Sequence, residues 1–238
     1  MEVIMKKIVC KNYEEMSREA ARIVAAEVVL KPDCVLGLAT GSTPVGMYSC
    51  LCKENLDFSN VSAFNLDEYY PIQKSNDQSY SYFMKKNLFN YINIKNSDIP
   101  NGEAKDTDAE CARYDSAIEA AGGIDLQILG LGPNGHIGFN EPDDTLSVGT
   151  HTVSLTPSTI EANSRFFESA DDVPRHAITL GLGGIMKAKK ILVLASGKAK
   201  ADVVKAMFSG KITTKIPATL LQLHNDVTLI VDEAADGK

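Results

Sequence analysis

The chain has no long apolar run and no block of Lys and Arg, and these two absences exclude whole classes of protein. Its longest apolar stretches are the length of a β-strand, too short to cross a bilayer. The N-terminus carries no apolar segment of signal-peptide length, so we expect a cytoplasmic protein with no membrane partner. Acidic residues outnumber basic ones, 31 to 24, for a formal charge of −7. Because phosphate neutralisation dominates nucleic acid binding, that partner is not expected either.

Cysteine is scarce and irregularly spaced. There are five, at Cys10, Cys34, Cys50, Cys52 and Cys111. Cys50-x-Cys52 has neither the CxxC spacing nor a second ligand pair, so a zinc site is not indicated. The pattern predicts reduced, mostly buried thiols and no bound metal.

What is present is typical of a single globular α/β domain. The 238 residues are 44% apolar and 23% charged, and no linker or low-complexity stretch divides residues 1–238. Apolar strands alternate with helical patterns, which predicts a mostly parallel open sheet with helices on both faces, a Rossmann-like, doubly wound fold. The expected strands span about 34–38, 61–66, 126–129, 177–180, 190–195 and 227–231, and the expected helices begin near 12, 45, 79, 106 and 198.

Three of these strands run into loops of small residues, after positions 38, 129 and 195. In open α/β sheets, ligands bind outside the carboxyl ends of the strands. The three loops therefore predict one shared crevice. A polar, helix-permissive segment at about 155–174 lies off the sheet pattern, and we interpret it as a lid.

The first loop contains Gly41, Ser42 and Thr43 between a strand and a helix. Glycine lets the backbone approach a ligand, and hydroxyls together with helix-end N–H groups suit a phosphate. The GxxxxGK[ST] order of a Walker A loop is absent. A plain strand–helix turn, with Ser42 or Thr43 as N-cap, explains the loop equally well.

The second loop reads GLGPNG and then HIGFNEP. It matches GxGxxG, but it does not open a helix, and no acidic residue ends a following strand about 20 positions later, so a dinucleotide site is not favoured. His136 and Glu141 stand five residues apart, with Asn134 just before them. Such a loop can turn the histidine towards the carboxylate for acid–base work, although a surface histidine and a capping glutamate are the simpler interpretation.

Two further places carry charged groups that suit chemistry or phosphate. Asp67 and Glu68 follow a buried strand, so one can act as a general base while the other holds a helix N-terminus, and a polar turn is an equal alternative. Arg165 lies beside aromatics in the expected lid, and Lys198 begins a helix; both suit phosphate, although each alone is more often a solvated charge.

Taken together and in order, these segments resemble the glucosamine-6-phosphate deaminase family across almost the whole chain. The resemblance is carried by GLATGSTPVGMY, FNLDEYY, LGLGPNGHIGFNEP and NSRFF, and by residues 181–200. It implies conversion of glucosamine 6-phosphate and water to fructose 6-phosphate and ammonia, by aldose–ketose isomerisation coupled to deamination, with no cofactor.

The resemblance also assigns roles. It makes Asp67 the base at C2 of the open-chain sugar and His136 the ring-opening acid–base group, supported by Glu141. Gly41, Ser42, Thr43, Arg165 and Lys198 then hold the phosphate. Asn134 departs from the aspartate of some relatives; its side-chain oxygen can still accept from an imidazole N–H.

Allosteric, hexameric relatives hold their effector with an Arg and a Lys at the positions of His151 and Val153 here. We therefore expect an unregulated monomer. The alternatives are a 6-phosphogluconolactonase, whose Gly-His loop continues as a Ser-Leu-Phe-Pro type string, and a non-enzymatic sugar-phosphate sensor. A sensor needs a DNA-reading helix pair ahead of the sheet, and only one short strand and one helix precede Cys34.

Overall fold

A central sheet of seven parallel strands organises the chain. The computed structural model describes residues 5–156, 160–161, 167 and 173–238. The strands lie in the order β1 (Lys6–Cys10), β10 (Val227–Asp232), β9 (Lys190–Ala195), β6 (Leu126–Gly130), β2 (Val35–Leu38), β3 (Ser62–Asn65) and β5 (Asn96–Asp98). Every pairing among them is parallel. The predicted parallel open sheet is confirmed.

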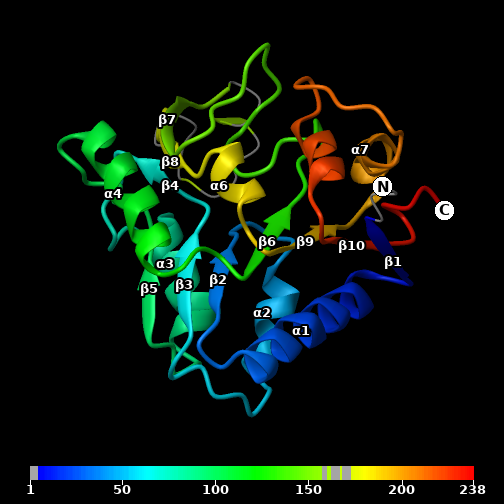
Figure 1. Cartoon of the computed structure of the whole chain (residues 1–238), viewed down its shortest axis with the longest axis horizontal. Helices are drawn as coiled ribbons and strands as arrows, with labels where there is room; N and C mark the ends of the chain where they lie inside the picture. Colours follow the sequence, from blue (N-terminus) through cyan, green and yellow to red (C-terminus); the bar gives the residue numbers. More distant parts are fainter. Residues whose placement is uncertain (1–4, 157–159, 162–166, 168–172) are drawn as a thin grey trace.

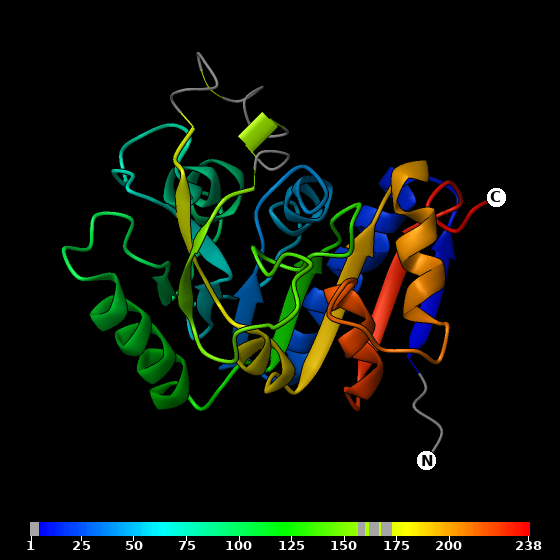
Figure 2. The same cartoon turned by 90° about the horizontal axis from the view of Figure 1, so that it is seen from above.

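Helices cover both faces of this sheet (Figures 1 and 2). On one face, residues of β2 and β6 pack with α1 (Tyr13–Leu30), α2 (Val45–Leu51), α3 (Tyr80–Met84) and the π-helical turn η1 (Lys85–Phe89). On the other face, residues of β6, β9 and β10 pack with α4 (Thr107–Ala120), α6 (Leu182–Met186), α7 (Ala201–Met207) and the 3₁₀ segment η4 (Pro217–Leu223). Each strand of the middle of the sheet is therefore apolar on both sides, as its sequence indicates.

The start of α1 follows from local chemistry. The Asn12 side chain accepts a hydrogen bond from the backbone N–H of Glu15 at 2.9 Å, as an N-cap residue does. The Glu15 carboxylate reaches back to the backbone N–H of Lys11 at 2.7 Å, one residue earlier than in a standard capping box. Within the described part of the chain, no helix is both long and apolar enough to span a membrane.

A second, antiparallel sheet stands beside the first, and the sequence did not predict it. Its strand order is β4 (Asp67–Tyr70), β8 (His176–Thr179) and β7 (His151–Ser154). For Asp67 and Glu68 a polar turn was an equal alternative and no strand was predicted over 67–70, while residues 177–180 were expected to continue the run of strands in the large sheet. Both belong to this small sheet instead, because the chain leaves β3 at Leu66 and at once pairs with β8.

The topology brings the three small-residue loops together, as predicted. Their strands β9, β6 and β2 are neighbours in the large sheet, so the loops lie side by side at its carboxyl edge. From β2 the chain first builds the sheet outward through β3 and β5, and then crosses to the other side of β2 to build β6, β9 and β10. This reversal is the switch point at which open α/β sheets bind ligands. Most of the lid predicted at 155–174 lies outside the described residues.

Candidate active site

The first loop, after β2, is shaped by a tyrosine from α1. The Tyr13 hydroxyl accepts from the Gly46 backbone N–H at 2.8 Å and lies 3.0 Å from the Ser42 carbonyl oxygen, to which it donates. Ser42 is exposed and Thr43 is half-buried, so their polar groups are accessible to a ligand. Nothing in the sequence pattern of α1 singled out Tyr13 for this role.

The third loop, after β9, is held by the end of the neighbouring strand. Asp232 on β10 accepts from the Ser196 hydroxyl at 2.6 Å and from the Gly197 backbone N–H at 3.0 Å. These bonds lower the pKa of Asp232 against its burial, which keeps the carboxylate ionised. The chain then enters a 3₁₀ turn, η3 (Lys198–Lys200), and Lys198 is exposed at its start. The helix expected from 198 thus begins as a tighter turn.

The second loop, after β6, brings His136 and Glu141 together. The Nδ1 atom of His136 lies 3.1 Å from Oε1 of Glu141. The side chain of Asn134 does not contact the imidazole, contrary to our expectation that its oxygen accepts from a ring N–H. Its amide nitrogen donates to Oε2 of Glu141 at 2.7 Å, and its oxygen accepts from the backbone N–H of His136 at 3.2 Å. Asn134 therefore orients the carboxylate, and the carboxylate faces the ring.

The imidazole can take this place because residue 132 is glycine. A Cβ atom added to Gly132 overlaps the Cδ2 and Nε2 atoms of His136. The ring thus lies flat against the Gly132 backbone, with Nδ1 turned to Glu141. This leaves Nε2 as the ring nitrogen for a substrate.

Asp67 begins β4 and is buried, with 6% of its surface exposed. Within the described residues, its carboxylate receives no hydrogen bond. Burial, with the neighbouring charge of Glu68 as the second cause, raises the pKa of Asp67 to about 8. A carboxyl group with a pKa near neutral is suited to exchange protons with a substrate carbon or oxygen.

Asp67 and the loop that carries His136 meet at Gly138. A Cβ added there lies 3.0 Å from Oγ1 of Thr179 and 3.5 Å from Oδ2 of Asp67. Gly138 also has a φ of +59°, a conformation that favours glycine. The loop that carries His136 and Glu141 therefore passes directly over Asp67.

Glu68 resolves the choice that the sequence left open between the two carboxylates. Its oxygens accept from the backbone N–H groups of Tyr69 (3.0 Å), Tyr80 (2.8 Å) and Ser81 (2.9 Å). The last two are at the start of α3, so Glu68 holds that helix N-terminus. Burial raises the pKa of Glu68 to about 7, and the three N–H donors act against this rise.

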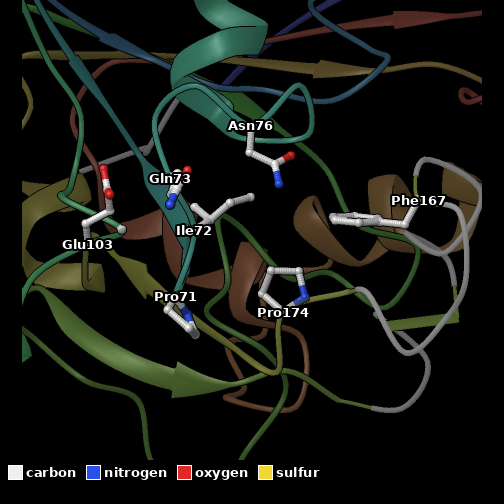
Figure 3. Close-up of a pocket in the computed structure, with 8 residues that line it drawn as sticks. Pro71, Ile72, Gln73, Asn76, Glu103, Phe167 and Pro174 are labelled. Carbon is white, nitrogen blue, oxygen red and sulfur yellow. The ribbon is translucent and has the colours of Figure 1, made fainter.

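Two cavities flank β4. One, of about 280 Å³, is lined by Gly41 and Ser42 of the first loop and by Tyr69, Tyr80 and Phe83 among others. The other, of about 420 Å³, lies beyond Tyr70, at the end of β4 opposite to Asp67 (Figure 3). It is lined by Pro71, Ile72, Gln73, Asn76, Gly102, Glu103, Phe167 and Pro174, none of which we predicted as a site residue.

The structure thus brings Asp67, Asn134, His136 and Glu141 into one cluster at the carboxyl edge of the sheet, beside the loops that carry Gly41, Ser42, Thr43 and Lys198. Arg165 lies outside the described residues. Among the residues that are described, there is no group of three or more His, Cys, Asp or Glu placed to hold a metal ion.

The fold and the site define an α/β enzyme that places acid–base side chains beside small-residue loops suited to an anionic group. Comparisons make this specific. The family described as glucosamine-6-phosphate isomerases/6-phosphogluconolactonase matches residues 11–230, and the chain belongs to it.

Individual relatives point the same way. A glucosamine-6-phosphate deaminase of Clostridium perfringens (strain 13) is 63% identical over 97% of this chain and 98% of its own length. That of Clostridioides difficile (strain 630) is 58% identical over 98% and 96%. A solved structure described as a monomeric glucosamine-6-phosphate deaminase is 45% identical, covers 98% of this chain and 99% of its own, and has a TM-score of 0.95. The 6-phosphogluconolactonase of Trypanosoma cruzi, 19% identical with a TM-score of 0.81, covers 100% and 98% and shares the fold.

Proposed function

We propose that the protein converts glucosamine 6-phosphate and water to fructose 6-phosphate and ammonia. The observation that carries this proposal is the meeting of two proton-transferring groups in one cluster, the buried carboxyl of Asp67 and the His136–Glu141 pair. High identity to deaminases over nearly the whole chain supports it. The reaction needs these two groups at different atoms of the sugar.

His136 serves the first step, ring opening. The C1 hydroxyl of the pyranose loses a proton while the ring oxygen gains one, and the C1–O5 bond breaks to leave an open-chain aldehyde. Nε2 of His136 shuttles the proton, because Nδ1 faces Glu141. Glu141 stabilises the charge on the ring when it is protonated, and Asn134 keeps Glu141 turned towards it.

Asp67 serves the second step, isomerisation. Its carboxylate removes the proton from C2, the C1 aldehyde oxygen takes a proton from the C2 ammonium, and the electrons move to give an enolamine. The same carboxyl group then returns the proton to C1, which leaves a protonated imine at C2. The substrate carries an ammonium at C2, and this positive charge favours the ionised form of Asp67 when the substrate binds. Water then adds to the resulting C2 imine, and ammonia leaves as the ketone forms.

The phosphate belongs at the first and third loops. Ser42 and Thr43 offer hydroxyls and Gly41 an open approach, while the Lys198 ammonium supplies a charge-assisted contact. We propose Arg165 as a further phosphate ligand, on the resemblance alone. Alanine at Lys198 is expected to raise KM for glucosamine 6-phosphate strongly and to change little for unphosphorylated glucosamine, if that sugar reacts.

Incubation with glucosamine 6-phosphate, with ammonia and fructose 6-phosphate measured separately, tests the proposal. We expect equal molar amounts of the two products. The matched control is Asp67→Asn, which keeps the shape of the site. Release of neither product by the native chain, or hydrolysis of 6-phosphogluconolactone in its place, would overturn the proposal. The lactonase alternative is not favoured, since the relatives so named are near 20% identical.

We further propose that the chain acts as a monomer in the cytoplasm. A monomeric solved relative with a TM-score of 0.95 supports the first part. The proposed substrate is a sugar phosphate, an intracellular type of metabolite, and this supports the cytoplasmic location.

A further inference from the structure

Thr179 is a buried threonine placed between the two halves of the proposed chemistry. It ends β8, none of its surface is exposed, and it pairs directly with Asp67 in the antiparallel ladder of the small sheet. Paired residues in such a ladder point to the same face of the sheet, with their Cβ atoms about 5 Å apart. The Thr179 side chain therefore lies beside the proposed base.

The hydroxyl of Thr179 also binds the histidine loop. Its Oγ1 accepts from the backbone N–H of Phe139 at 3.2 Å, three residues past His136. The residue after β8 repeats the attachment, since the Leu180 carbonyl oxygen accepts from the Asn140 side-chain amide at 2.9 Å. The loop is thus fastened to the end of the strand that faces Asp67.

Asp67 itself is held in a different way. Its strand is fixed to β8 by backbone pairing, and just before it the Leu66 carbonyl accepts from the Leu180 N–H at 2.7 Å. Removing the hydroxyl of Thr179 leaves this ladder intact but releases the Phe139 N–H. The Thr179 side chain therefore sets the position of the histidine loop relative to Asp67. The position of Asp67 itself does not depend on it.

From this geometry we infer that Thr179 is a positioning residue that sets the ring-opening loop at its working distance from Asp67. The inference rests on the proposed function. It predicts that loss of the hydroxyl slows ring opening more than it slows proton transfer at carbon, because only the first uses His136.

The two steps can be measured separately. Ammonia release from glucosamine 6-phosphate needs both groups. Exchange of a C1 hydrogen in D₂O, measured on the open-chain keto form of fructose 6-phosphate that equilibrates with the furanose in solution, needs only the base: a C1–H bond breaks, Asp67 carries the proton to solvent, and a deuteron returns to C1. We expect Thr179→Val to lower the first rate about 10- to 100-fold more than the second, as for a small misplacement of a catalytic group. Thr179→Ser keeps the hydroxyl and is expected to preserve the native ratio.

Thr150→Val is the matched control, because Thr150 is also buried and its hydroxyl donates to Asp115, away from the histidine loop. We expect it to leave the ratio of the two rates unchanged. Equal loss of both rates in Thr179→Val, or no loss, would overturn the inference. If Thr179→Val does not fold, Thr179→Cys, with a weak sulfur acceptor, gives the same comparison. Failure of the native chain to release ammonia refutes the proposed function instead, so the two failures are distinct.

Discussion

The raised pKa of Asp67 makes a pH-dependent prediction. The base must be ionised to act, and its pKa in the free protein is about 8, so we expect kcat/KM to fall as the pH drops below about 8. In the complex, the substrate ammonium lowers that pKa, so the acid limb of kcat is expected at a lower pH than that of kcat/KM. Initial rates from pH 5.5 to 9.5 measure both profiles. Two limbs at the same pH would show that the substrate charge does not reach Asp67.

Asp67→Asn tests both rate and stability. Without a proton acceptor, the rate is expected to fall by about 10²–10⁴. The folded pKa of Asp67 lies above the ordinary value of 3.8, so the folded chain binds more protons than the unfolded chain between about pH 4 and 8. The native stability contributed by this group is therefore lost as the pH rises through that range. The variant is expected to melt above the native protein at pH 8, with a difference that shrinks towards pH 4, as followed by thermal unfolding.

The Asn134–Glu141–His136 chain predicts a graded series. His136→Gln is expected to abolish turnover, because no ring nitrogen remains to carry the proton. Asn134→Ala leaves the carboxylate and removes only its orienting bond, so we expect a smaller loss in kcat, about tenfold, with KM nearly unchanged. Steady-state kinetics of the two variants check the order. A larger loss for Asn134→Ala than for His136→Gln would contradict it.

At this scale the sequence named the candidate groups and the contact between His136 and Glu141, but not their other contacts. Asp67, His136, Glu141 and Asn134 were named as candidates from residue type and family pattern. The bond from Asn134 to Glu141 was missed, because an amide can turn either its oxygen or its nitrogen to a neighbour. Tyr13 and Thr179 were missed because their partners are distant in sequence.

Among the elements, β4 binds the start of α3 through the side chain of Glu68, beside a ring contact between Tyr69 and Tyr80. Glutamine there keeps the size but replaces one of the two accepting oxygens by an NH₂ group, so at least one of the three backbone N–H groups loses its acceptor. We expect Glu68→Gln to lower the free energy of unfolding by about 1–3 kcal/mol. It also removes a negative charge beside Asp67, which lowers the pKa of Asp67, so the acid limb of kcat/KM is expected to move to lower pH. An acid limb that stays at the same pH would show that the charge of Glu68 does not affect the pKa of Asp67.

The parallel sheet could be predicted because the strands in its middle are apolar on both faces and three of them end at a small-residue loop. The small sheet could not. Asp and Glu are disfavoured in strands, so a polar turn was left as an equal alternative for β4, and no strand was predicted there despite its two tyrosines. The backbone N–H groups that bind Glu68 offset that preference. Two of these donors come from α3, so the local sequence of β4 does not indicate them.

For the whole molecule we expect kinetics without a switch. The family resemblance assigns the effector-holding positions of allosteric relatives to His151 and Val153 on β7, and Val153 has no side-chain group to bind a phosphate. A ligand changes activity only if it binds two states differently. We therefore expect hyperbolic kinetics, a Hill coefficient of about 1 and no activation by N-acetylglucosamine 6-phosphate. Substrate titrations with and without that compound, together with sedimentation at micromolar protein, provide the test. Sigmoidal curves, or a stable hexamer, would contradict it.

The two sheets divide the proposed work between them. The phosphate loops follow strands of the large sheet, whereas Asp67 begins β4 of the small one and the histidine loop is tied to β8. The junction between the sheets therefore sets the distance between the proposed phosphate site and the proposed base. That distance matches one length of substrate. A five-carbon amino sugar phosphate, anchored by the same terminal group, presents its second carbon one bond short of the base. We therefore expect the selection for chain length to lie in the spacing between the two sheets, with no side chain needed against the missing carbon.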